Sequence, residues 1–264
     1  MFDFILGNGK IIDGTGNPWY IADIGILAGK ISEIGVIPKN RGRAFIDVTG
    51  LAVSPGFIDI HSHADFVLPL KDHMNIIGCY AKQGITTLVV GNCGLSPVPV
   101  NPVNLELLKS YTGFLQAGDI GWDWTSMGEF LSSLEASGVG YNTIPLASHG
   151  AARIAVMGFD STPPDKSQMS KMQELVSQSM EEGAFGLSAG LIYAPGMYAS
   201  TDELIEITKP LRPFRGVFTC HIRGSSETGI EATEEIIEVA RANQIPVEHS
   251  HLEAYGEKYW KNID

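Results

Sequence analysis

The amino-acid sequence predicts an α/β fold: a small β-subdomain followed by a (β/α)8 TIM barrel that is truncated after its sixth strand. Residues 1–52 contain short alternating apolar runs between turn residues, a pattern typical of strands. From residue 53 onward, strand-like runs alternate with helical stretches, which predicts a parallel sheet with helices outside. Six strands can be counted in residues 53–264, whereas a closed barrel needs eight. We therefore expect residues 53–264 to form an incomplete barrel.

Residues 1–52 are expected to form a small β-sandwich-like subdomain, since they are too few to build a large core alone. Ala28 and Gly29 lie between two alternating runs, which predicts a hairpin turn. The strands expected here are Asp3–Leu6, Lys10–Ile12, Ala22–Leu27 and Lys30–Ile34.

The barrel part is expected to contain six strands separated by helices. The strands are Phe57–Ile60, Ile85–Val90, Asn142–Ala147, Phe185–Ala189, Val217–Cys220 and Ile245–Glu248. The helices are 72–83, 126–137, 164–182, 201–210 and 227–243. Residues 95–124 are expected to form an irregular loop or lid over an active site.

Side chains that can bind a metal follow five of these strands. They are His61 and His63 after the first strand, Cys93 after the second, His149 after the third, His221 after the fifth and His251 after the sixth. Because chemistry in such barrels gathers at the carboxyl ends of the strands, we expect most of these groups to converge on one cation. At single positions such as His149 and His249, a hydrogen-bonding role is the interpretation that we favour.

Composition excludes several classes of function. A net charge of −12 over 264 residues argues against a nucleic-acid partner, because phosphate binding needs clustered Lys and Arg. No window approaches the roughly twenty apolar residues of a membrane span, and the N-terminus lacks the basic segment of a secretory signal. The three cysteines are odd in number and widely spaced, so we expect no disulfide framework and a cytoplasmic location.

Five segments together resemble the amidohydrolase superfamily, and within it the N-acyl-D-amino-acid deacylases, or D-aminoacylases. The segments are Pro-Gly-Phe-Ile-Asp-Ile-His-Ser-His-Ala-Asp at 55–65, Gly-Asn-Cys-Gly at 91–94, Phe-Gly-Leu-Ser-Ala-Gly-Leu-Ile-Tyr at 185–193, His-Ile-Arg-Gly at 221–224 and Ser-His-Leu at 250–252. The likeness covers nearly the whole chain in the correct order. It implies a barrel of the metal-dependent hydrolase type.

The resemblance implies zinc-dependent hydrolysis of a linear amide: deacylation of an N-acyl-D-amino acid to a carboxylate and the free amino acid by metal-activated water. Cys93, His221 and His251 would hold one tightly bound zinc ion. His61 and His63 would hold a second, weaker metal, with the Cys93 sulfur able to bridge. The general base of the superfamily is an aspartate after strand eight, which lies beyond Asp264, so the isolated chain is expected to lack it.

The resemblance also suggests how the substrate is bound. Tyr193 and Arg223 lie at the expected rim and are candidate contacts to the substrate or to an oxyanion. Glu253 stands where the deacylases often carry a Lys that is tied to the substrate carboxylate. An anion at this position would repel the carboxylate of a D-amino acid unless another group compensates. The expected partner is a small N-acyl amino acid or related amide, with a complementing chain or a homo-oligomer as a further partner.

Three alternatives stay open. The chain can be a catalytically inactive zinc-binding fragment, as the missing strands suggest. It can be a cyclic-amide hydrolase of the dihydroorotase or hydantoinase type, although these commonly use a carboxylated Lys on strand four, and residues 184–193 contain no Lys. An acidic binding module without metal would require the convergence of the strand-end ligands to be a coincidence.

Overall fold

The computed structural model describes residues 1–263. The chain divides into two compact units, Met1–Phe57 and Ile58–Asp264. The first is built around one sheet and the second around a series of parallel strands with helices between them.

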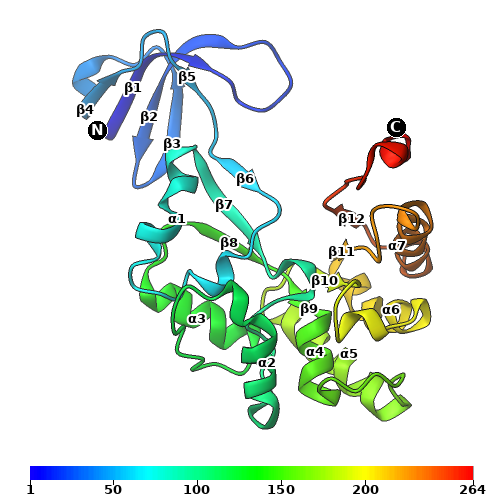
Figure 1. Ribbon diagram of the computed structural model, residues 1–264. Coiled ribbons are helices and arrows are strands. Elements are labelled where there is room, and N and C mark those ends of the chain that lie inside the picture. Colours follow the sequence, from blue (N-terminus) through cyan, green and yellow to red (C-terminus); the bar gives the residue numbers. More distant parts are fainter. Residues whose placement is uncertain (264) are drawn as a thin grey trace. The chain divides into compact units, whose positions relative to one another are not determined.

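The first unit contains a five-stranded sheet with the order β3-β2-β1-β4, in which β5 also pairs with β1 (Figure 1). Its strands are β1 (Phe2–Ile11), β2 (Tyr20–Leu27), β3 (Lys30–Gly35), β4 (Gly42–Asp47) and β5 (Ala52–Val53). The predicted hairpin turn is confirmed: Ala28 and Gly29 connect β2 to β3 with φ angles of 51° and 73°. Positive φ at both central residues matches the right-handed twist of the flanking strands.

Two expectations for this sheet were wrong in detail. The runs predicted as separate strands at residues 3–6 and 10–12 belong to the single strand β1, whose register with β2 shifts between Leu6 and Gly9. Asn8 lies inside this irregularity with a φ of 63°. The glycines on either side of Asn8 therefore mark a bulge within a strand, not a turn between two strands. Strands β4 and β5 were not predicted.

The second unit confirms the six predicted barrel strands, to within two residues at most ends. They are β6 (Phe57–Asp59), β7 (Ile85–Val90), β8 (Asn142–Pro145) with β9 (Ala147–Ser148), β10 (Gly186–Gly190), β11 (Val217–His221) and β12 (Val247–Ser250). The third predicted strand is interrupted at Leu146 and so divides into β8 and β9. The strand orders are β6-β7-β8 and β12-β11-β10-β9, and the pairs within β9–β12 are all parallel.

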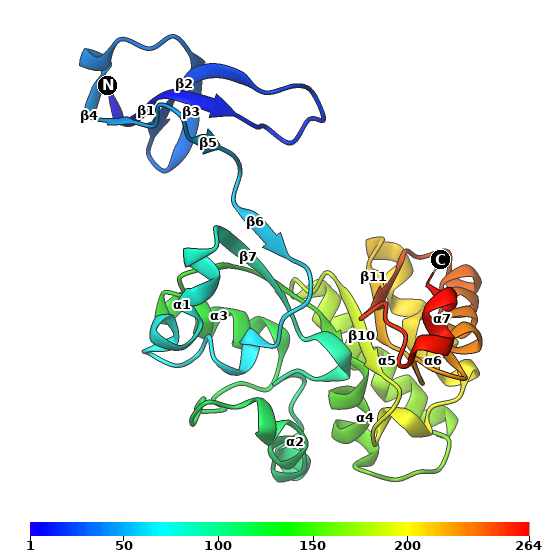
Figure 2. The same ribbon diagram turned by 45° about the horizontal axis from the view of Figure 1, so that its top comes forward.

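Helices separate these strands: α4 and α5 lie between β9 and β10, α6 between β10 and β11, and α7 between β11 and β12. Figure 1 labels all of these elements, and Figure 2 shows α4 to α7 from a second direction. The helices are α1 (His73–Lys82), α2 (Leu105–Thr112), α3 (Met127–Ser137), α4 (His149–Met157), α5 (Lys166–Glu181), α6 (Thr201–Thr208) and α7 (Gly229–Asn243). Two were not predicted: α2 lies inside the stretch expected to be irregular, and α4 starts directly after β9. Among the residues described, no helix combines the length and hydrophobicity that a membrane span requires.

The core of the second unit fixes the strands that carry the candidate ligands. Leu88 on β7, Leu187 on β10 and Phe218 on β11 are completely buried in one apolar cluster. Because parallel strands point in the same direction, their carboxyl ends emerge along one edge of this core. The side chains that follow those ends are therefore held by a rigid framework.

Candidate metal centre

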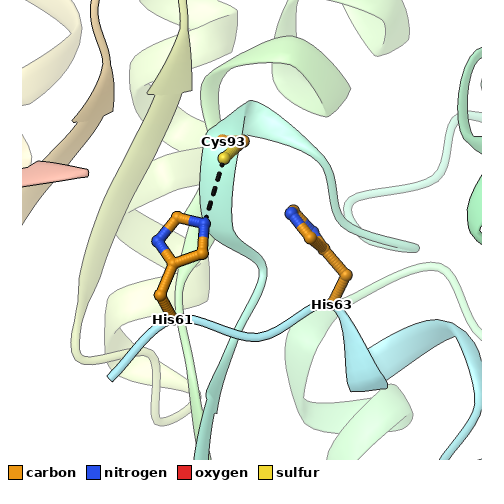
Figure 3. Close-up of side chains that lie close together, drawn as sticks. All are labelled: His61, His63 and Cys93. Carbon is orange, nitrogen blue, oxygen red and sulfur yellow. Dashed lines mark hydrogen bonds between the residues drawn. The ribbon is translucent and has the colours of Figure 1, made fainter. Parts of the chain in front are cut away.

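The first pair of candidate ligands lies on the loop that follows β6. The Asp59 carboxylate accepts the His61 backbone N–H at 3.1 Å, and the Ser62 N–H donates to the Val89 carbonyl on β7 at 3.0 Å. These bonds fix the loop against the neighbouring strand. The His61 and His63 rings extend from the same side of the loop toward Cys93, with their centroids 5.6 Å apart (Figure 3).

Cys93 lies in the tight turn 91–94 after β7. Its own φ is 57°, and Gly91 and Gly94 have φ angles of 81° and 67°. A Cβ atom on Gly94 would stand 2.8 Å from the Gly190 nitrogen, and one on Gly91 would clash with the Leu146 carbonyl oxygen. Only glycine satisfies both the left-handed backbone and the close approach at these two positions.

The remaining ligand candidates arrive from strands far along the chain. His221 is the last residue of β11, and His251 follows β12. The Cys93 Sγ atom lies 3.2 Å from Nε2 of His61 and 3.2 Å from Nε2 of His251. The His251 ring lies 4.3 Å from the His61 ring and 4.8 Å from the His221 ring, centroid to centroid.

The five side chains form two overlapping groups that share Cys93. In the group of His61, His63 and Cys93, and in the group of Cys93, His221 and His251, the potential ligand atoms lie within 4.8 Å of one another. Ligands on a tetrahedral zinc ion, with Zn–S and Zn–N bonds of about 2.3 and 2.0 Å, stand roughly 3.5 Å apart. The spacing of both groups is therefore of the size that one cation requires.

The protonation states of His61 and His63 suit metal binding, whereas Cys93 must first lose a proton. Burial, followed by the neighbouring His251, lowers the pKa values of His61 and His63 to about 4, so both imidazoles are neutral at pH 7. The buried Nδ1 atoms of both rings have no hydrogen-bond partner among the described residues. Burial raises the pKa of Cys93 to about 12, so the thiol must lose its proton when it becomes a ligand. The donor set, one sulfur and several unprotonated nitrogens, fits zinc.

Tyr193, expected at the rim, lies beside the candidate metal ligands. Its hydroxyl donates to the Cys93 carbonyl oxygen at 2.6 Å, and its ring centroid is 5.6 Å from that of His221. Burial raises the pKa of Tyr193 above its ordinary value, so the hydroxyl remains a hydrogen-bond donor.

Arg223 and Glu253 are both engaged with other groups. The Arg223 guanidinium donates from Nε to Glu235 Oε2 at 2.8 Å, and from its Nη atoms to the carbonyl oxygens of Met197 and Ala199. Glu253 Oε1 accepts the Ser225 hydroxyl at 3.3 Å. The roles predicted for Arg223 and Glu253 in substrate binding stay predictions.

His149 belongs to a buried network outside the two ligand groups, in agreement with the hydrogen-bonding interpretation. Its Nε2–H donates to Glu203 Oε1 at 2.9 Å. Arg153 donates from Nη1 to both Glu203 oxygens at 2.6 Å, and the three side chains are almost completely buried. Sequence reasoning missed Arg153 because it missed α4, on which Arg153 lies, and without Arg153 it had no reason to single out Glu203 in the predicted helix 201–210. His249 is likewise absent from both ligand groups.

Comparisons with known proteins show the family to which this chain belongs. Residues 44–259 match the model of the amidohydrolase family. The D-aminoacylase of Alcaligenes xylosoxydans xylosoxydans is 33% identical over 97% of this chain and 51% of its own length. This chain thus spans about half the length of the curated relatives that it matches.

Two solved structures share the fold. A D-aminoacylase studied for one-metal activation and second-metal attenuation in a binuclear centre has a TM-score of 0.86 at 33% identity, over 98% of this chain and 53% of that one. The N-acyl-D-glutamate deacylase of Bordetella bronchiseptica, in complex with zinc and a phosphonate inhibitor, has a TM-score of 0.82 at 30% identity, again over 98% and 53% of the two chains. The chain therefore belongs to the amidohydrolase family, and its predicted resemblance to the N-acyl-D-amino-acid deacylases is confirmed.

Proposed function

We propose that this chain carries the metal centre of a zinc-dependent deacylase that hydrolyses N-acyl-D-amino acids to a carboxylate and the free amino acid. The observation that carries the proposal is the convergence of one thiol and four imidazoles at the ends of four strands. In this proposal, residues 1–52 form the β-subdomain and residues 53–264 the metal-binding part of the barrel. The free cysteines among the described residues support a reducing, cytoplasmic location.

Two metal positions of unequal affinity are part of the proposal. Cys93, His221 and His251 would hold the tight zinc ion, and His61 and His63 the weaker one, with the Cys93 sulfur between them. The binuclear centre described for D-aminoacylase supports this division. When bound, zinc would act as a Lewis acid that lowers the pKa of water to about 7 and so makes a nucleophile available at neutral pH.

A deacylase fits the site better than a cyclic-amide hydrolase does. Residues 184–193, which include β10, contain no Lys that could be carboxylated to bridge two metals. Cys93 on the turn after β7 would supply the bridging atom instead. The similarity to the D-aminoacylase and to the D-glutamate deacylase points in the same direction.

The zinc-binding fragment is the second candidate. Among the residues that the structure describes, neither ligand group includes an Asp or Glu that could also serve as the general base. This candidate requires that a group outside the two ligand groups, or a complementing chain, supplies the general base.

The test is to purify the 264-residue chain, measure its zinc content, and assay release of acetate from N-acetyl-D- and N-acetyl-L-amino acids. Zinc with turnover of the D-substrates supports the deacylase. Stoichiometric zinc without turnover selects the fragment. A chain that takes up no zinc at all contradicts both.

Glu253 gives a prediction about substrate charge. Burial and the neighbouring His251 lower the pKa values of His221 and His249, and the Glu253 carboxylate acts on both in the opposite direction, so its field extends to the candidate metal centre. Glu253→Lys should therefore strengthen the binding of an N-acetyl-D-amino acid carboxylate about tenfold relative to its neutral amide, because a like-charge contact becomes an opposite-charge one. Calorimetric titration of the zinc-loaded chain with both ligands measures this ratio.

The matched control for that prediction is Glu238→Lys, which makes the same charge change on the exposed face of α7. The ratio of affinities should stay unchanged in the control. An equal shift in both variants would mean that only the net charge of the protein matters.

A further inference from the structure

Two hydroxyl groups hold the turn that carries Cys93. The Ser188 hydroxyl donates to the Gly91 carbonyl oxygen and accepts the Gly94 N–H at 2.9 Å. Ser188 lies on β10 and is completely buried. One side chain therefore closes both ends of the turn 91–94 from the neighbouring part of the sheet.

Tyr193 holds the middle of the same turn. Its hydroxyl donates to the carbonyl oxygen of Cys93 itself at 2.6 Å. Tyr193 follows β10 along the chain, so both hydroxyl groups come from one segment, residues 188–193. We call this pair, Ser188 and Tyr193, the Cys93 clamp.

The backbone of Cys93 needs such support. Its φ of 57° and ψ of 25° place a residue with a side chain in the left-handed region. Such a conformation persists only where the surrounding structure holds it. In this conformation Sγ lies 3.2 Å from both His61 Nε2 and His251 Nε2, as a shared ligand must.

We propose that Ser188 and Tyr193 are positioning residues that hold the Cys93 thiol where the two groups of ligands meet. The inference rests on the metal site proposed above. In this proposal the Tyr193 hydroxyl holds the backbone of Cys93. This role is separate from any contact between Tyr193 and the substrate. It also accounts for a buried Ser in a strand whose neighbours are otherwise small or apolar residues.

The test uses Co²⁺ as the probe, because a bound thiolate gives a charge-transfer band that reports directly on Cys93. In Ser188→Ala, the dissociation constant for Co²⁺ should rise about tenfold or more, in the range typical for groups that orient metal ligands. The charge-transfer band at saturation should also be weaker or shifted. Tyr193→Phe should show the same changes, smaller in size because it removes one hydrogen bond and not two.

Ser148→Ala is the matched control. Ser148 is equally buried and pairs in register with Ser188 from the next strand, but its hydroxyl accepts the Ala151 N–H at the start of α4. Its Co²⁺ affinity and spectrum should equal those of the unsubstituted chain. Circular dichroism of each variant without metal shows whether it is folded, and Tyr193→Phe carries the test where Ser188→Ala does not fold.

The possible outcomes distinguish failure of the Cys93 clamp from failure of the proposed metal centre. Unchanged affinity and unchanged spectra in folded Ser188→Ala and in Tyr193→Phe would overturn the clamp and leave the metal centre intact. Failure of the unsubstituted chain to bind Co²⁺ would overturn the metal centre itself. An equal loss of affinity in Ser148→Ala would also overturn the clamp, because the effect would then be one of general stability.

Discussion

Cys93→Ala should abolish tight metal binding, with the dissociation constant for zinc rising by more than about 100-fold, beyond the effect typical of outer-shell changes. Cys93 is the only residue common to both ligand groups among the described residues, so its removal takes a donor from each proposed metal position at once. His221 and His251 alone would leave two imidazoles, fewer than a closed or an open zinc site uses. Zinc content after dialysis, and the loss of the thiolate band with Co²⁺, measure the change.

Cys220→Ala is the control for this prediction. Cys220 is a completely buried residue of β11, one position before His221, and it belongs to neither ligand group. The control changes a buried thiol without removing a donor, so it should retain full zinc occupancy. Full occupancy in Cys93→Ala as well would remove Cys93 from the site.

Glu203→Gln should lower the free energy of unfolding by about 3–5 kcal/mol, the cost of leaving the other member of a buried ion pair without its partner. Arg153 is completely buried and donates to both Glu203 oxygens at 2.6 Å. Glutamine keeps the shape of the side chain but removes the charge that compensates the guanidinium. Urea denaturation at pH 7, followed by circular dichroism, gives the difference.

The effect of Glu203 should also depend on pH in a defined direction. Burial alone would raise the pKa of Glu203, but the hydrogen bonds and charges of His149 and Arg153 outweigh burial and lower it from 4.5. The stabilisation by the carboxylate is therefore complete above pH 4.5 and is lost as the pH falls through the lowered value. The difference between the unsubstituted chain and Glu203→Gln should shrink only in that acidic range.

Glu206→Gln provides the comparison on the same helix. Glu206 accepts from Lys209 at 2.6 Å, but both side chains are about half exposed. Exposed pairs of this kind contribute only about 0–1 kcal/mol, so the control should change stability little. Equal losses in the two variants would show that the position in α6, and not the buried charge, matters.

Much of the framework could be predicted because hydrophobic periodicity and turn residues are local signals. The six parallel strands were recognised from apolar runs such as Ile85–Val90, and the ligands from the residues that follow those runs. Their convergence follows from strand direction alone, once the strands are known.

The parts that were not predicted depend on contacts between distant residues. Helix α4 was missed because Gly150 in its first turn disfavours a helix, yet a Cβ at this position would stand 2.7 Å from the Tyr111 hydroxyl. The requirement for glycine is thus set by packing against a residue elsewhere in the chain. The direction of the Arg223 side chain depends in the same way on its hydrogen bond to Glu235 of α7. The role of Ser188 depends on its hydrogen bonds to Gly94 and Gly91, which lie 94 and 97 positions away in the sequence.

Cys93 and His251 are 158 positions apart in the sequence, so metal binding at the proposed centre would also affect the stability of the fold. An ion held by both residues acts as a reversible cross-link between two distant strands, and it binds the native chain in preference to the unfolded one. At a free concentration 100 times the dissociation constant, such an ion adds about 2.7 kcal/mol to the stability of the fold. A chelator should consequently lower the melting temperature of this chain.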